Sequence, residues 1–286
     1  MRILITGAGG AIGKKLCQYL REIGHEIIPV VRRNGTISAD LREEATVVRL
    51  VKAYAPDLIV HLAALTNLSF CEQNKEVSRA TNVDITEILT RACSGFGIRM
   101  IFFSSDYVFG KYDHFWREED SPCPTTQYGI DKVASEQLIQ ERLSNYAIVR
   151  TAQLYGVAGD LVSLVCQALL SHQEFIAFAN FVNCPTWIGD LFLMLNTIIN
   201  HSHQGIFHCV GPEPMSRYQY ACEIAKAFAL DTAYIQAVDL DFSIDIRPPV
   251  VRLNGTSTYE TLQVYPRKLQ DNLPLCASYA MEYTQQ

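Results

Sequence analysis

Thr6-Gly7-Ala8-Gly9-Gly10-Ala11-Ile12-Gly13 lies between an apolar run at residues 2–6 and an amphipathic run at residues 12–23. A glycine turn between a strand and a helix lets backbone N–H groups and the helix N-terminus approach a pyrophosphate. The spacing is T-G-x-x-G-x-x-G, since Ile12 stands where the G-x-G-x-x-G fingerprint has its last glycine. The stretch predicts dinucleotide binding, and a turn needed only for tight strand–helix packing is the alternative. We expect cofactor contacts from Gly7, Gly10, Ala11, Ile12 and Gly13.

Short apolar runs and longer amphipathic runs alternate from this stretch to about residue 150. The pattern predicts strands at 2–6, 26–31, 57–62, 99–104 and 146–150. It predicts helices at 12–23, 43–54, 82–96 and 128–143. Because parallel strands need crossover connections, this alternation indicates an α/β protein with a Rossmann-type doubly wound parallel sheet.

The pattern is less regular after Arg150. Helices are expected at 161–170 and 191–200, a strand at 205–210, and a helix with a serine cap at 216–229. This half is predicted to form a smaller C-terminal α/β lobe, partly interleaved with the first. We therefore assign residues 1–150 to a dinucleotide-binding domain and residues 151–286 to this lobe.

Composition narrows the class of partner. The chain has 286 residues, is 49% hydrophobic and carries a formal charge of −6, so the net field offers little to nucleic acid or an anionic membrane. Nine cysteines are spread singly, which is typical of a reducing cytosol. Lys14 and Lys15 end the first apolar run too early for a signal peptide, and no apolar stretch has the length of a membrane span. We expect a soluble cytoplasmic protein that binds small molecules.

The end of the second predicted strand indicates the form of the cofactor. NAD-binding sites usually place a carboxylate there to hold the ribose hydroxyls, but this chain has Arg32 and Arg33. Planar guanidiniums pair well with phosphate oxygens, so the sequence favours NADP(H), and a solvated basic pair is the alternative. Asp40-Leu41 follows a short loop and is expected to approach the adenine.

A second group of residues indicates proton transfer. Tyr128 and Lys132 are four residues apart at the start of a predicted helix, so they share one face. A nearby cation stabilises phenolate and would lower the tyrosine pKa towards neutrality. Y-x-x-x-K alone is common, but here Ser104-Ser105 also stands at the carboxyl end of a predicted strand, where sheets of this type place catalytic groups.

These motifs together resemble the extended short-chain dehydrogenases/reductases, and within them the dTDP-4-dehydrorhamnose reductases and their sugar-nucleotide-binding relatives. The resemblance covers nearly the whole chain. The matching segments are TGAGGAIG from Thr6, HLAALT from His61, NVD from Asn82, SSDYVFG from Ser104, REEDSPCP from Arg117, YGIDK from Tyr128, RTAQLYG from Arg150 and CPTWIGD from Cys184.

The resemblance implies an NADP(H)-binding Rossmann domain at residues 1–150, a smaller C-terminal α/β substrate lobe at residues 151–286, a reaction, and roles for individual residues. Hydride would pass from the nicotinamide of NADPH to a keto carbon of a nucleotide-linked 4-keto-6-deoxysugar. Ser105, Tyr128 and Lys132 would be the catalytic triad, with Tyr128 and Lys132 also contacting the cofactor. Ala63 and Ala64 would pass under the cofactor. The substrate would be contacted by Thr66, Ser105, Asp106, Tyr107, Gln153 and Arg247.

Comparison with relatives argues against one function and leaves others open. Related dehydratases carry glutamate after the catalytic aspartate, whereas Tyr107 follows Asp106 here, which counts against water elimination. Rhamnose-forming reductases have tryptophan after R-T-A, whereas this chain has Gln153, so the sugar is left open. A non-catalytic NADP(H)-binding regulator resembling the methionine adenosyltransferase β subunit is one alternative, and a sugar-nucleotide epimerase is another.

Histidines at 201, 203 and 208 do not form a convincing metal site. They straddle a predicted helix–strand loop, and no carboxylate or second cysteine lies near them in the sequence. We therefore predict no metal. A homodimer is compatible with the resemblance.

Overall fold

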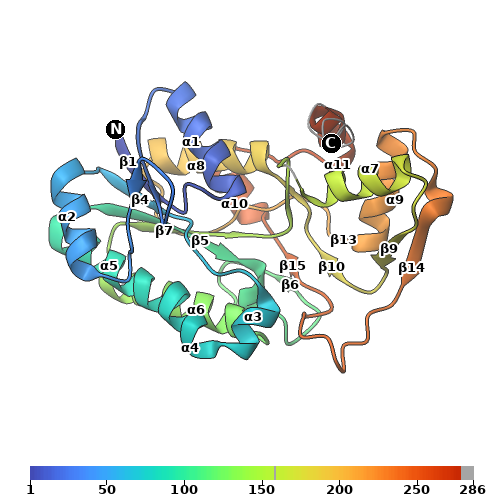
Figure 1. The fold of residues 1–286 in the computed structure, drawn as a ribbon, viewed down its shortest axis with the longest axis horizontal. Coiled ribbons are helices and arrows are strands. Elements are labelled where there is room, and N and C mark those ends of the chain that lie inside the picture. The colour runs from blue at the N-terminus through green and yellow to red at the C-terminus, as the bar shows by residue number, and fades with distance from the viewer. Residues whose placement is uncertain (158, 278–286) are drawn as a thin grey trace. The chain divides into compact units, whose positions relative to one another are not determined.

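The computed structural model describes residues 1–157 and 159–277. Contacts divide the chain into two compact units, which are described separately here, and the chain passes between them several times (Figure 1). Unit 1 contains Met1–Val108, Pro122–Arg150 and His201–Phe207. Unit 2 contains Phe109–Ser121, Thr151–Asn200 and His208–Gln286. The assignment of separate functions to residues 1–150 and 151–286 stays a prediction.

Unit 1 is built on a seven-stranded sheet in the order β12-β7-β5-β4-β1-β2-β3. Strand β1 pairs in parallel with β2 and β4, β2 pairs in parallel with β3, and β4 with β5. The strands are β1 Arg2–Thr6, β2 Glu26–Val31, β3 Ile37–Ser38, β4 Leu58–His61, β5 Arg99–Ser105, β7 Tyr146–Thr151 and β12 Gly205–His208. The chain reverses its direction across the sheet between β1 and β4, which confirms the predicted Rossmann-type fold.

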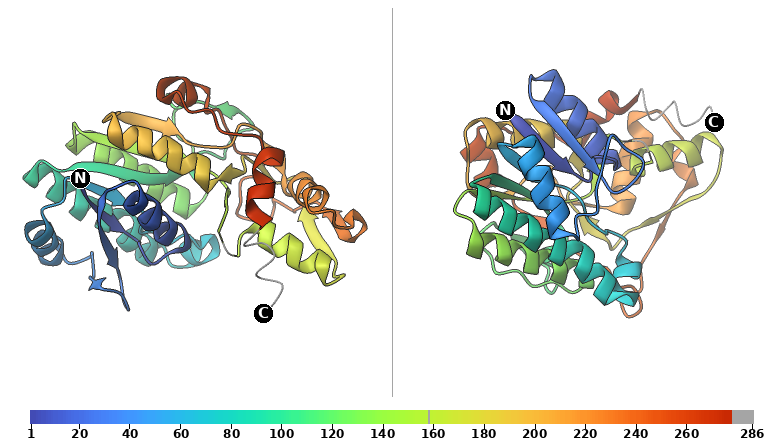
Figure 2. Two further views of the ribbon diagram at one scale, coloured as in Figure 1. Left: turned by 90° about the horizontal axis from the view of Figure 1, so that it is seen from above. Right: turned by 60° about the vertical axis from the view of Figure 1, so that its left-hand side comes forward.

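Helices α2, α5 and α6 cover one face of this sheet (Figures 1 and 2). Their apolar side chains and alternate strand residues form one buried cluster, which includes Leu4, Ile59, Met100 and Ile148. Strand side chains alternate between faces, so these four belong to the same face. The main helices are α1 Ala11–Glu22, α2 Glu44–Tyr54, α5 Ile85–Phe96 and α6 Gln127–Arg142.

Several boundaries differ from the sequence prediction. The helix expected from Asn82 is preceded by a π-helical turn at Ala80–Asp84, and α5 begins only at Ile85. The strand expected at 205–210 is present as β12, but it lies at the edge of the large sheet rather than in the C-terminal lobe. Two short helices, α3 Leu68–Gln73 and α4 Lys75–Arg79, were not predicted, because each is too short for a clear helical period.

Unit 2 is an α/β assembly of short paired strands and helices, and by its residue ranges it is about as large as unit 1, rather than smaller as the sequence had suggested. Its core includes Tyr155, Val165, Tyr220 and Leu273. Ser216 caps α9 through a full capping box with Gln219. The strands are β6 Phe115–Trp116, β8 Leu154–Tyr155, β9 Phe175–Phe178, β10 Val182–Asn183, β11 Thr186–Trp187, β13 Met215–Ser216, β14 Ile235–Val238 and β15 Arg252–Leu253. The helices are α7 Leu161–Leu170, α8 Ile188–Asn200, α9 Arg217–Ala227, α10 Thr256–Leu262 and α11 Leu269–Asn272.

Across the residues that the structure describes, no helix combines the length and the apolar character that crossing a membrane requires.

Candidate functional site

The glycine turn lies at the point where the strand order reverses. Gly7 has φ +69°, and a Cβ there would lie 2.8 Å from the backbone N of Ala63, at the end of β4. A Cβ on Gly13 would lie 2.3 Å from the carbonyl oxygen of Gly7. Only glycine therefore allows β1, β4 and α1 to approach this closely. Gly10 is the N-cap of α1 and offers no side-chain cap, and Ala11 and Ile12 form the first turn.

Buried polar groups support this turn from below. The Thr6 hydroxyl lies 2.7 Å from His61 Nδ1 and accepts a hydrogen bond from the backbone N–H of Ala63 (3.2 Å). His61 Nε2 lies 3.1 Å from the Thr86 hydroxyl. Burial, with a smaller effect of the Lys132 charge, lowers the pKa of His61 to about 3. His61 is therefore neutral near pH 7, and its side chain links β4 to Thr6 of β1 and Thr86 of α5. Ala63 and Ala64, which follow it in the chain, are partly buried.

The residues predicted to select the cofactor have different environments. Arg32 and Arg33 are exposed in the bend after β2. Asp40 forms an ion pair with Arg42, and hydrogen bonds from Arg42 lower the pKa of the Asp40 carboxyl to about 2. Leu41 is buried in the core cluster, so its side chain supports the fold. The side chains of Arg32 and Arg33 are thus accessible to a ligand, whereas the Asp40 carboxylate is already paired with Arg42.

Ser105, Tyr128 and Lys132 come together at the carboxyl end of β5 and the start of α6. The Ser105 side chain lies close enough to Tyr128 to act on the pKa of its phenol, while the Ser105 hydroxyl donates a hydrogen bond to Asp106 Oδ1 (2.9 Å). Lys132 Nζ lies 5.7 Å from the centroid of the Tyr128 ring and donates to the carbonyl oxygen of Phe103 (2.8 Å). All three predicted catalytic side chains are at most 8% exposed. Thr126 caps α6 and so fixes the helix start that carries Tyr128.

The expected pKa of Tyr128 is wrong in direction. Burial, assisted by the Asp106 carboxylate, raises the pKa of Tyr128 well above its ordinary value, and the Ser105 hydrogen bond opposes this only in part. Lys132 does not lower the pKa of free Tyr128, because burial lowers the pKa of Lys132 to about 8, so the amine is already neutral at the higher pH where the phenol would ionise. Tyr128 is therefore a neutral phenol near pH 7, which suits a group that donates a proton.

The residues predicted to contact the substrate are divided between the two units. In unit 1, Thr66 is exposed just before α3. Asp106 is buried and accepts a hydrogen bond from the Ser105 hydroxyl (2.9 Å). The Tyr107 ring meets the Tyr128 ring edge-on, with centroids 6.0 Å apart. Asp106 and Tyr107 thus lie beside the predicted catalytic pair. Gln153 and Arg247 belong to unit 2.

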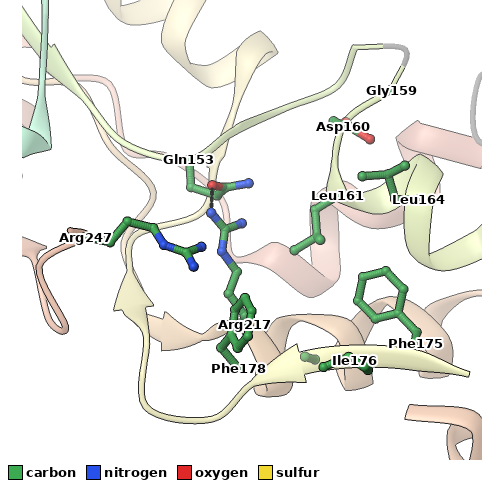
Figure 3. Close-up of a pocket in the computed structure, with 11 residues that line it drawn as sticks. Gln153, Gly159, Asp160, Leu161, Leu164, Phe175, Ile176, Phe178, Arg217 and Arg247 are labelled. Atoms are coloured by element: carbon green, nitrogen blue, oxygen red, sulfur yellow. Dashed lines mark hydrogen bonds between the residues drawn. The ribbon is translucent and has the colours of Figure 1, made fainter. Parts of the chain in front are cut away.

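Unit 2 contains a cavity of about 380 Å³ that Gln153 and Arg247 line together with Arg217 (Figure 3). Arg217 donates to the Gln153 side-chain carbonyl, and Gln153 has a positive φ of 29°. Both guanidiniums lie 5.2 Å from the centroid of the Phe181 ring. Arg247 is further held by Asp245, through Nε (2.8 Å) and Nη2 (2.6 Å). Phe178 also lies against Arg247, with the guanidinium 5.1 Å from its ring centroid, and further apolar lining comes from Leu161, Leu164, Phe175 and Ile176.

Sequence reasoning missed a buried ionic group next to the triad. Glu136 receives hydrogen bonds from Arg150 and Ser104, and the Glu136–Arg150 pair is only 1% exposed on each side. Its sequence signal was available, since Glu136 follows Lys132 by four residues and therefore lies on the same helical face. The partner Arg150 is distant along the chain and could not be assigned from spacing.

Similarity to known proteins identifies the family of the chain. The profile of the family described as "RmlD substrate binding domain" matches residues 1–281. The chain belongs to this family. Among curated relatives, this RmlD-family chain is similar to methionine adenosyltransferase 2 subunit beta of Xenopus laevis, at 29% identity over 83% of the chain and 75% of the relative.

Two solved structures resemble the RmlD-family chain over almost its full length. One is a dTDP-4-dehydrorhamnose reductase from Clostridium acetobutylicum, with 25% identity, a TM-score of 0.88 and 100% coverage of both chains. The other is the dTDP-4-dehydrorhamnose reductase of Bacillus anthracis in complex with NADP, with 25% identity, a TM-score of 0.86, and coverage of 95% and 96%. The predicted resemblance is confirmed at the level of family and fold.

Proposed function

We propose that the protein is an NADPH-dependent oxidoreductase that reduces the keto group of a nucleotide-linked 4-keto-6-deoxysugar. The observation that carries this proposal is the buried grouping of Ser105, Tyr128 and Lys132 at the carboxyl end of β5, in a chain of the RmlD family. Two similar structures are reductases of this kind, which supports the assignment of the reaction class.

The roles of the three side chains follow from their protonation and contacts. Ser105 donates a hydrogen bond to the ketone oxygen and so stabilises the charge that develops there. Tyr128, a neutral phenol because burial raises its pKa, gives its proton to the forming alkoxide. Lys132, cationic below about pH 8, stabilises the phenolate left behind.

The turn at Gly7, Gly10 and Gly13 suits a dinucleotide, because it places the N-terminus of α1, which has no side-chain cap at Gly10, at the point where the strand order reverses. When bound, the nicotinamide cofactor supplies the hydride. Arg32 and Arg33, exposed after β2, favour NADPH because guanidiniums hydrogen-bond a 2′-phosphate. Similarity to a reductase in complex with NADP supports this preference.

The unit 2 cavity is assigned to the nucleotide-linked part of the substrate. Arg217 and Arg247 present donors suited to a diphosphate, and the apolar lining suits the less polar parts of the ligand. Gln153 lies next to Arg217 and supplies an amide instead of an aromatic ring, so sugars with a hydrogen-bonding substituent are the first to test.

A regulatory subunit is the second candidate, because the relative at 29% identity is a subunit of methionine adenosyltransferase. Turnover separates the two functions. Purified protein is incubated with NADPH and a panel of dTDP-, UDP-, GDP- and CDP-linked 4-keto-6-deoxysugars, and loss of the reduced nicotinamide absorbance is followed. We expect turnover with at least one sugar. Tight NADPH binding without turnover across the panel would favour the regulator.

A further inference from the structure

Glu136 forms a buried ion pair with Arg150 next to the predicted catalytic residues. It is 1% exposed in α6 and accepts hydrogen bonds from Arg150 Nε (3.0 Å), Arg150 Nη2 (2.7 Å) and the Ser104 hydroxyl (2.5 Å). Burying two opposite charges costs desolvation energy that their attraction only partly offsets, so well-packed apolar residues often stabilise such a position equally well. A role beyond stability is therefore worth seeking.

The position of Glu136 suggests this role. Lys132 donates to the Phe103 carbonyl oxygen, and one helical turn later Glu136 accepts from Ser104. Helix α6 is thus tied to two consecutive residues of β5, directly before Ser105. These ties set the axial position of α6 against β5, and so hold Tyr128 where its side chain meets that of Ser105.

Charge gives the same residue a second effect. Burial lowers the pKa of Lys132 to about 8, whereas the carboxylates of Glu136 and Asp131 raise it. His61, from β4, is neutral near pH 7 and adds no charge. Among the described residues, the other ionisable groups at these ends of β5 and α6 include Asp106, Tyr107, Tyr128 and Arg150, and Cys71 and Glu72 from α3. Glu136 therefore favours the charged form of Lys132.

We propose that Glu136, held by Arg150, is a positioning residue that keeps Ser105 in register with Tyr128 and keeps Lys132 charged. The proposal rests on the proposed reduction. It extends the site by one carboxylate that touches neither cofactor nor substrate and acts through its neighbours.

The test removes both charges together, because Glu136→Gln alone leaves a buried Arg150 without its carboxylate and is liable to unfold. We expect the double variant Glu136→Gln, Arg150→Met to fold and to lose about tenfold in kcat with little change in KM. In a plot of kcat against pH, the fall on the alkaline side (the alkaline limb) should occur at a lower pH than in the wild type. The limb moves down because Lys132 loses its proton at lower pH once Glu136 is gone. Glu136→Asp keeps the charge at shorter reach, so its limb should stay in place while kcat falls.

A matched control is available on the same helix. Arg142 of α6 pairs with Glu87 of α5 at 3.0 Å, but both side chains are about one-third exposed. Glu87→Gln with Arg142→Met should leave kcat and the pH profile unchanged. A folded Glu136→Gln, Arg150→Met protein with wild-type kcat and pH profile would overturn the proposal.

A readout without turnover separates this proposal from the reaction itself. The Lys132 ammonium is titrated by NMR in protein containing isotope-labelled lysine, with Lys132→Met to assign its signal. We expect its midpoint to fall in the double variant. An unchanged midpoint contradicts the proposal, whereas a lowered midpoint in a protein that reduces no sugar overturns the proposed function and retains the coupling of Glu136 to Lys132.

Discussion

The polar groups of the predicted catalytic site in unit 1 and those of the unit 2 cavity differ in burial. Ser105, Tyr128 and Lys132 are almost fully buried, and Lys132 and Ser105 are hydrogen-bonded to backbone groups. Arg217 and Arg247 line a cavity of about 380 Å³ and lie against an aromatic ring. Fixed groups suit chemistry that needs exact alignment, while long side chains at an open cavity suit binding. Substitutions in unit 1 should therefore change kcat, and those in the cavity KM.

The largest effect is expected from Tyr128→Phe. The substitution removes only the hydroxyl that is to donate the proton, so kcat should fall about 10²-fold or more. NADPH affinity should stay within a few-fold, since the ring remains. Steady-state kinetics and fluorescence titration with NADPH measure the two quantities. Near-normal kcat would show that the proton comes from another group and would break the comparison.

Arg217→Met tests the other side of the comparison. A lost charge-assisted hydrogen bond is worth about 1.5–3 kcal/mol, so KM for the nucleotide sugar should rise roughly 10- to 150-fold with kcat nearly unchanged. Arg252→Met is the matched control, because Arg252 also belongs to unit 2 and pairs with Asp113 outside this cavity. A fall in kcat as large as that of Tyr128→Phe would contradict the division of labour.

Gly13→Ala tests how tightly the glycine turn is built. The new Cβ would lie 2.3 Å from the Gly7 carbonyl oxygen, so the free energy of unfolding should fall by about 1–3 kcal/mol and NADPH affinity should weaken. Gly95→Ala, in α5, meets no atom within 4 Å and should be neutral or stabilising by about 0.5–1 kcal/mol. Denaturant unfolding of both variants measures the two stabilities. Equal stabilities would contradict the argument that Gly13 lies too close to the Gly7 carbonyl oxygen to accept a side chain.

The smallest effect is expected from the exposed arginines. Arg32→Ala with Arg33→Ala should reduce the preference for NADPH over NADH about tenfold, because surface charge pairs contribute little each. Arg21→Ala, which changes an exposed arginine in the last turn of α1, is the control. Dissociation constants for both cofactors measure the preference. An unchanged ratio in the double variant would remove the 2′-phosphate argument.

The local pattern of hydrophobic and turn residues predicted most elements of unit 1 and some of unit 2. The strand at residues 26–31 and the helix at 161–170 have their predicted bounds, because hydrophobic period and turn residues act over short distances. The meeting of Ser105 and Tyr128 could be expected from their places at a strand end and a helix start. The Glu136–Arg150 pair and the partnership of Gln153 with Arg217 could not, since they join residues that only the fold brings together.

The tyrosine pKa shows a second limit of sequence reasoning. The motif suggested that Lys132 would make Tyr128 more acidic, but spacing carries no information on burial. Desolvation acts on both groups and opposes charge on each, so the phenol stays protonated. The sequence identified the reacting groups, and their protonation required the structure.

Strand β12 has a consequence for how the polypeptide is made. The large sheet ends in the order β12-β7-β5, and β12 begins only at Gly205. When β7 has just left the ribosome, the edge of β7 that later pairs with β12 has unpaired backbone N–H and C=O groups. They stay unpaired until more than fifty further residues have been synthesised. Truncation after residue 150 would make that exposure permanent. An expressed N-terminal half should then be prone to aggregate, even though it carries every residue of the glycine turn and the predicted catalytic triad.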